Sequence, residues 1–200
     1  MTKIYLIRHG EKKSSKGDPE LSDLGEKQAK RTAMHLSNLG IQYIYCSPSR
    51  RTKETAEIIA KQTKLPIVVS ELLQERANWG NAEKCSFDEF LQIWDRASLE
   101  RKWQPPIGDS SFNTGLRLET FVNNYLNSNH SDIAIVAHGG IIADYLRNIA
   151  DEDELNSINP VFLEKKDRLI RECSITTIEV NTLETGPTIV EIADTKHLFD

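Results

Sequence analysis

Short apolar segments alternate with longer amphipathic segments over the first 70 residues of the chain. Residues 3–7, 42–46 and 65–69 are rich in β-branched and aromatic residues, which predicts three buried strands. Between the first two strands apolar residues recur at helical spacing, with Ser22 suited to cap the start of that helix and Gly40 to end it. Its apolar face comprises Ala29, Ala33, Leu36 and Leu39. Helical spacing follows the second strand at Thr52, Thr55, Ala56, Ile59 and Ala60.

The same alternation returns in the C-terminal half of the chain. A helix is predicted at 111–127, and residues 132–137 form the clearest buried strand, followed by an apolar helix that ends at Ile149. Two further strands are predicted near 174–180 and 188–192. A Gly-Pro pair separates these last two strands, so we expect them to pair as a hairpin or to lie at a sheet edge.

The segment between the two halves is less regular. Residues 70–115 contain several prolines and glycines around one predicted helix at 87–99, so we interpret this segment as a small cap inserted over one end of the sheet. Strands that alternate with helices favour a mostly parallel sheet covered on both faces. The predicted fold class is therefore α/β, a three-layer α/β/α sandwich with a cap insertion.

Composition narrows the class of protein. The chain has 200 residues, of which 38% are hydrophobic and 28% charged, as expected for one globular domain spanning 1–200. Its apolar runs are far shorter than the roughly 20 residues of a membrane span, and the N-terminal segment does not resemble a signal peptide, so we expect no membrane association and a cytoplasmic location. The net charge of −5 disfavours nucleic acid as a partner.

The cysteines and histidines suggest no metal or disulfide chemistry. Cys46, Cys85 and Cys173 are odd in number and far apart, so they fit neither a disulfide framework nor a structural zinc site. The five histidines also lack the spacing of metal ligands. We therefore expect reduced thiols, no metal and no cofactor.

Three predicted strands end in polar or cationic residues that serve no packing purpose. The segments are Arg8-His9-Gly10, Ser47 followed by Arg51, and His138-Gly139-Gly140. Ligands of open parallel sheets bind beyond the carboxyl ends of the strands, so these segments are placed to surround one anion. Each has a simpler alternative when taken singly: a histidine in a loop, an arginine on a solvated helix face, and a glycine pair in a turn.

Several ordered motifs resemble those of the histidine phosphatase superfamily, which has the phosphoglycerate mutase-like fold. Residues Leu6-Ile7-Arg8-His9-Gly10-Glu11 resemble the signature of this family. Residues 21–29 and 47–56 resemble the family segments that follow the signature. Similar stretches follow in order at 73–76, 108–110 with Arg117, 137–140, 173–176 and 194–198. The match covers nearly the whole chain, and several motifs in order are far more specific than any one alone.

The resemblance implies a phosphomonoesterase that works through a phosphohistidine intermediate without a metal. His9 is then the nucleophile, and Glu75 is the acid that protonates the leaving group and later activates water. His138 is implied as both a catalytic and a phosphate-binding residue, donating a hydrogen bond if it is protonated. The implied phosphate-binding set is Arg8, Arg51, His138 and Gly139. Without the resemblance, a surface salt bridge between Glu75 and Arg76 would be the simpler interpretation.

Departures from the family pattern separate the alternatives. Lys12 and Ser15 stand where many members have threonine and asparagine, which disfavours the usual mutase and sugar-bisphosphatase subgroups. Gly139 follows the second histidine in place of the aspartate of the acid phosphatase branch. The chain is also shorter than cofactor-dependent mutases, so a phosphatase is favoured. A phosphoglycerate-type mutase and a non-catalytic phosphate-binding regulatory module are kept as alternatives.

Other residues leave the substrate open. Lys12, Lys13 and Lys16 are placed to contact a second anionic group, although three lysines in a loop are more often simply solvated. Trp79 and Trp103 either line the pocket or pack under the cap. A small phosphorylated metabolite and a phosphoprotein both fit as partners, and the oligomeric state is not determined by the pattern.

Overall fold

The computed structural model describes residues 1–81, 85–128, 131–181 and 186–199. Its centre is a six-stranded sheet in the order β3-β2-β4-β1-β5-β6. The strands are β1 (Thr2–Arg8), β2 (Tyr43–Cys46), β3 (Ile67–Val69), β4 (Ile133–Ala137), β5 (Ile175–Val180) and β6 (Pro187–Asp194). The first four are parallel, whereas β5 runs antiparallel to β1, and β6 runs antiparallel to β5 at the edge. The mostly parallel sheet and the closing hairpin are confirmed.

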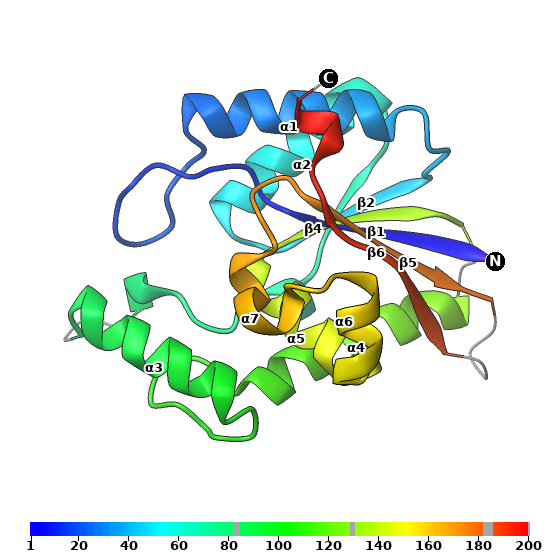
Figure 1. Ribbon diagram of the computed structural model, residues 1–200. Coiled ribbons are helices and arrows are strands. Elements are labelled where there is room, and N and C mark those ends of the chain that lie inside the picture. Colours follow the sequence, from blue (N-terminus) through cyan, green and yellow to red (C-terminus); the bar gives the residue numbers. More distant parts are fainter. Residues whose placement is uncertain (82–84, 129–130, 182–185, 200) are drawn as a thin grey trace.

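Helices cover both faces of the sheet, as Figure 1 shows. On one face lie α1 (Asp23–Leu36) and α2 (Arg50–Thr63), and on the other lie α4 (Ser111–Ser128) and α5 (Gly139–Ile149). Because successive residues of a strand point to opposite faces, Tyr5 and Ile7 join the core under α1 and α2, while Ile4 and Leu6 join the core under α4 and α5. The three-layer α/β/α architecture is therefore confirmed.

Two details differ from the sequence prediction. Helix α1 begins after Ser22, whose side chain accepts a hydrogen bond from the N–H of Gly25, but it ends at Leu36. The chain continues as a turn to Gly40, where φ is +70°. Gly40 ends the turn rather than the helix, because this left-handed conformation is open to glycine. The short helices α6 (Glu152–Ile158) and α7 (Phe162–Lys165) were not predicted.

The segment between β3 and α4 lies beyond the carboxyl ends of the strands. It contains two short 3₁₀ helices, Glu71–Leu73 and Trp79–Asn81, and helix α3 (Phe87–Leu99). Helix α3 occupies the predicted range and begins with a capping box between Ser86 and Glu89. In Figure 1 it is set apart from the sheet, on the same side as the loop that follows β1.

Candidate active site

The carboxyl ends of three adjacent strands bring the predicted site residues together. His9 follows β1, Ser47 follows β2 and His138 follows β4, the strand that lies between the other two. Backbone hydrogen bonds fix these ends, because the N–H of His9 donates to the Ala137 carbonyl over 3.0 Å and the N–H of Ser47 to the Val136 carbonyl over 3.1 Å. The convergence expected from the sequence is observed.

The loop after His9 is held against the start of α1. A Cβ at Gly10 would lie 2.6 Å from the Gly25 carbonyl oxygen, so this close approach requires glycine. The Glu11 carboxylate accepts a hydrogen bond from the Ser22 hydroxyl over 2.7 Å, and the Glu11 N–H donates to the Gln28 side chain over 2.9 Å. The motif at 21–29 therefore supports the loop that carries His9.

The His9 imidazole is buried and has a fixed orientation. Its Nδ1 lies 2.8 Å from the Gly10 carbonyl oxygen, which can only accept, so Nδ1 carries the proton. Its Nε2 accepts a hydrogen bond from Nε of Arg51 over 3.0 Å. This arrangement leaves the basic lone pair on Nε2, which faces the arginine.

Arg51 connects the two histidines. It lies in the first turn of α2 with 6% of its surface exposed, and its Nη2 donates to Nδ1 of His138 over 3.0 Å. His138 Nε2 lies 2.9 Å from the Ser47 hydroxyl, and the two imidazole rings are 5.2 Å apart. Arg51 also contacts the Asp18 carboxylate at 3.3 Å. The interpretation of Arg51 as a solvated helix residue is therefore wrong.

The surroundings of both histidines favour the neutral form. Burial lowers the pKa of His9 and the pKa of His138 well below the ordinary value of 6.5, and the positive charge of Arg51 lowers them further. The neutral form suits His9 as a nucleophile. The same shift disfavours the imidazolium form of His138.

Arg8 is the second arginine of the site. Its Nη1 donates to the Ile170 carbonyl over 2.7 Å, and its Nη2 pairs with Glu172 at 2.5 Å. Among the described residues, the buried Nε–H of Arg8 has no hydrogen-bond acceptor. A buried donor without a partner costs about 1–3 kcal/mol, so it is expected where a ligand supplies the acceptor.

Glu75 lies at the N-terminus of α5. Its carboxylate accepts hydrogen bonds from the N–H groups of Gly140 and Ile141, both over 2.9 Å, and from its neighbour Arg76. The proposed salt bridge between Glu75 and Arg76 is wrong, because the buried Arg76 guanidinium pairs with Asp144 at 2.9 Å. Three backbone donors hold the Glu75 carboxyl group in place.

Arg8, His9, Arg51 and Glu75 line one cavity of about 400 Å³, a volume typical of small-molecule sites. His138 and Ser47 are buried next to this cavity and are not among its described lining residues. Gly139 also lines it, and Nη1 of Arg8 lies 3.3 Å from the position that a Gly139 Cβ would take. The cavity extends past the arginines to Lys12, Trp79 and the α3 residue Trp94.

The structure distinguishes the lysines and tryptophans whose roles the sequence left open. Lys12 lines the cavity, whereas Lys13 forms an exposed ion pair with Glu20 at 2.5 Å. Lys16 Nζ lies 5.2 Å from the centre of the Trp79 ring. Trp103 does not belong to the described lining and stacks with Arg96.

Trp94 was not singled out from the sequence. Its indole N–H donates to Asp167 over 3.0 Å, and its ring stacks on the guanidinium of Arg76. The available signal was its position on the apolar stripe of the predicted helix at 87–99.

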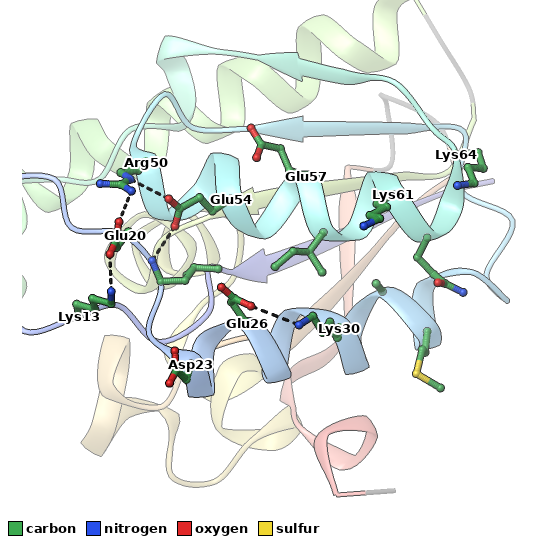
Figure 2. Close-up of a pocket in the computed structure, with 15 residues that line it drawn as sticks. Lys13, Glu20, Asp23, Glu26, Lys30, Arg50, Glu54, Glu57, Lys61 and Lys64 are labelled. Atoms are coloured by element: carbon green, nitrogen blue, oxygen red, sulfur yellow. Dashed lines mark hydrogen bonds and ion pairs between the residues drawn. The ribbon is translucent and has the colours of Figure 1, made fainter.

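A second and larger hollow of about 1010 Å³ is lined by residues of α1, α2 and the loop that follows β1. Figure 2 shows that charged side chains line it and pair with one another, including Arg50 with Glu54 and Glu26 with Lys30. Exposed pairs of this kind contribute little energy, and this hollow contains none of the site residues predicted from the strand ends. The candidate site is therefore the cavity at the strand ends.

The described residues contain no group of three or more histidine, cysteine, aspartate or glutamate side chains placed to hold a metal ion. No helix within the described part of the chain has the length and apolar character of a membrane span. The inner part of the cavity has the chemistry of an anion site, because Arg8, Arg51 and Lys12 lie beside the His9 imidazole and the Glu75 carboxyl group. Arg51 also connects this set to the buried His138.

Comparison with known proteins agrees with this description. Residues 4–194 match the histidine phosphatase superfamily (branch 1). A probable phosphatase of Schizosaccharomyces pombe is 30% identical over 98% of this chain and 95% of its own. A probable phosphoglycerate mutase of Proteus mirabilis is 26% identical over 100% of this chain and 96% of its own.

The solved structures agree on the fold. A mycobacterial glucosyl-3-phosphoglycerate phosphatase in complex with inorganic phosphate superimposes with a TM-score of 0.74, at 21% identity, over 98% of this chain and 99% of that one. The fold and the strand-end anion site together define a protein of the phosphoglycerate mutase-like class. The chain belongs to the histidine phosphatase superfamily.

Proposed function

We propose that this protein is a phosphomonoesterase that passes the phosphoryl group of its substrate to His9 and then to water. The observation that carries the proposal is the hydrogen bonding of the His9 ring, in which Nδ1–H donates to the Gly10 carbonyl and the lone pair of Nε2 faces Arg51. A neutral imidazole has a lone pair that can attack phosphorus. Because this lone pair faces Arg51, His9 lies where a phosphate group held by the arginine would bind.

In the first step, Nε2 of His9 attacks phosphorus in line. An N–P bond forms, the ester P–O bond breaks, and Glu75 transfers its proton to the leaving alkoxide. The N–H groups of Gly140 and Ile141 hold the Glu75 carboxyl group at one position in the cavity. The product alcohol then leaves.

In the second step, water attacks the phosphohistidine. The Glu75 carboxylate accepts a proton from the water, an O–P bond forms, and the N–P bond breaks to return His9 and inorganic phosphate. Splitting one displacement into two easier ones is the advantage of a covalent intermediate.

The cations of the site stabilise the transferring group. Arg51 is buried, and the unpaired Nε–H of Arg8 is available to a phosphate oxygen. The bound phosphoryl group brings the negative charge that favours protonation of His138, which then becomes a further donor. Gly139 supplies a backbone N–H at the start of α5, where the helix favours an anion. Catalysis then consists of positioning and electrostatic stabilisation, without a metal.

The substrate is a small phosphorylated metabolite or a phosphoprotein. A mutase is the second candidate, because relatives include probable phosphoglycerate mutases. A mutase conserves total ester phosphate, whereas a phosphatase releases it. The complete set of site residues disfavours a regulatory module without catalysis. Three free cysteines are consistent with a reducing compartment, which supports a cytoplasmic location.

The test is release of inorganic phosphate from a panel of phosphomonoesters, including phosphoglycerates, by the wild type and by His9→Ala in parallel. We expect release by the wild type and less than a few per cent of it by the variant. Circular dichroism and phosphate binding serve as the controls for folding. A His9→Ala variant that keeps substantial turnover contradicts the phosphohistidine mechanism, and conversion of one phosphoglycerate into another without phosphate release identifies a mutase.

A further inference from the structure

Helix α3 turns its apolar stripe toward the cavity. Phe87, Phe90, Leu91 and Trp94 recur at the spacing of one helix face, and all four line the cavity that contains His9 and Glu75. Trp79 continues the surface, because its ring lies edge to face with Phe87 at 5.1 Å. We call these five residues the aromatic wall.

The aromatic wall is not part of the described hydrophobic cores. Neither core cluster of the described residues includes any residue of α3. Phe87 is 51% exposed and Leu91 is 39% exposed, whereas Phe90 beside them is buried at 8%. An amphipathic helix normally buries its apolar face, so apolar side chains left exposed at the edge of a cavity indicate a ligand that covers them.

The aromatic wall lies on the side of the leaving group. Cη2 of Trp94 is 2.7 Å from the position that a Gly140 Cβ would take, and Oε1 of Glu75 is 2.5 Å from the same position. The indole is therefore the immediate neighbour of the proposed acid. Since Glu75 protonates the ester oxygen, the alcohol carbon attached to that oxygen points toward Trp94 and α3.

The carboxylates that line the cavity near this surface are paired, and the cations Arg76 and Lys16 pack against the rings of Trp94 and Trp79. Asp167 accepts the hydrogen bond of the Trp94 indole, and Asp95 pairs with Arg168 at 3.5 Å on the rim. Lys12 belongs to the cationic side, where burial and the charges of Arg51 and Arg8 lower its pKa. The cavity thus has one cationic side and one apolar side.

We propose that the aromatic wall binds the alcohol part of the substrate and that the preferred substrates are phosphomonoesters of apolar or aromatic alcohols. This inference rests on the proposed function, which orients the ester between His9 and Glu75. The phosphate end supplies the charge recognised by the arginines, and the alcohol end removes the apolar surface of α3 from water.

The experiment compares ethyl, butyl and hexyl phosphate, whose leaving groups have nearly the same basicity. Burial of each methylene corresponds to about a fourfold gain in kcat/KM. We expect kcat/KM to rise along the series and to exceed the value for 3-phosphoglycerate. Inorganic phosphate is measured in every case.

Two variants test whether the rise of kcat/KM with chain length comes from the aromatic wall. Phe87→Ala/Leu91→Ala truncates its two most exposed members, and we expect the ratio of kcat/KM between hexyl and ethyl phosphate to fall at least fivefold. Leu99→Ala is the matched control, because Leu99 is a 69% exposed apolar residue of the same helix outside the cavity lining. The control should keep the wild-type ratio.

The outcomes separate the inference from the proposed function. A wild type that releases phosphate equally from all three alkyl esters, or prefers 3-phosphoglycerate, overturns the inference and leaves the phosphatase function standing. A wild type that releases phosphate from no ester overturns the proposed function itself. If sedimentation shows that the double variant dissociates an oligomer while the alkyl series is unchanged, the wall is a subunit interface and the inference is wrong.

Discussion

Gly140 occupies a position in α5 where a side chain would displace the proposed acid. A Cβ there would lie 2.5 Å from Oε1 of Glu75 and 2.7 Å from the Trp94 ring. Ordinary carbon contacts are about 3.5–4.0 Å, so in Gly140→Ala the carboxyl group must retreat by about 1 Å. A misplacement of about 1 Å at a reacting group costs on the order of 10²-fold in rate.

The loss is expected to depend on the leaving group. An alkyl phosphate requires proton transfer from Glu75, so kcat for butyl phosphate should fall about 10²-fold in Gly140→Ala. Nitrophenyl phosphate has a leaving group that scarcely needs a proton, and its kcat should fall by less than about tenfold. The intrinsic helix preference for alanine over glycine, about 0.5–1 kcal/mol, offsets part of the clash, so the free energy of unfolding should change by less than about 1 kcal/mol.

A double-mutant cycle tests whether the effect passes through Glu75. Glu75→Gln alone should reproduce the leaving-group dependence, and Gly140→Ala added to it should cost less than about threefold more. Urea unfolding of all four proteins is the control for stability. Equal losses on the two esters, or fully multiplicative losses in the cycle, would refute the argument that Gly140 makes room for the acid.

Three further predictions concern the charged groups. Asp144→Asn leaves the buried charge of Arg76 uncompensated, so the free energy of unfolding should drop by about 3–5 kcal/mol in urea titrations; a drop below about 1 kcal/mol contradicts the role of this ion pair. Because the pKa of His9 is lowered in the folded protein, unfolding takes up a proton below pH 6.5 and stability is lost as the pH falls. His9→Gln should therefore lose less stability than the wild type between pH 7 and pH 5.5, by up to about 1.4 kcal/mol per pH unit, and parallel slopes would count against a neutral His9. Addition of EDTA should leave phosphate release unchanged, and activity that is lost and then restored by a divalent ion would show that the reaction needs a metal.

The order of strands and helices could be predicted from the sequence because it depends on local periodicity. The apolar stripe at 87–99 gave the observed bounds of α3, and the run at 132–137 gave β4 within one residue. The helix ending was less certain, because both Leu36 and Gly40 are plausible stops for α1 and tertiary packing decides between them.

The sequence predicted the part of the candidate site that lies at the ends of the strands. Parallel strands present their carboxyl ends at one edge, so His9, Ser47 and His138 had to be neighbours once β1, β2 and β4 were adjacent. Arg51 was placed near these strand ends because it follows Ser47 closely, and its role as a phosphate ligand came from the resemblance. Its contact with both histidines depends on how α2 packs on the sheet, which no local pattern contains.

The sequence by itself determined the α/β class, the strand-end residues and the family that the chain resembles. These properties depend only on local periodicity and on the order of motifs along the chain. Only the tertiary structure decided that Glu75 binds the N-terminus of α5, 65 residues away along the chain, and that Arg76 turns to Asp144 instead. It also decided that the apolar stripe of α3 faces a cavity and not a core. The physical reason is that periodicity determines which side of an element is apolar, whereas the path of the chain determines what that side meets.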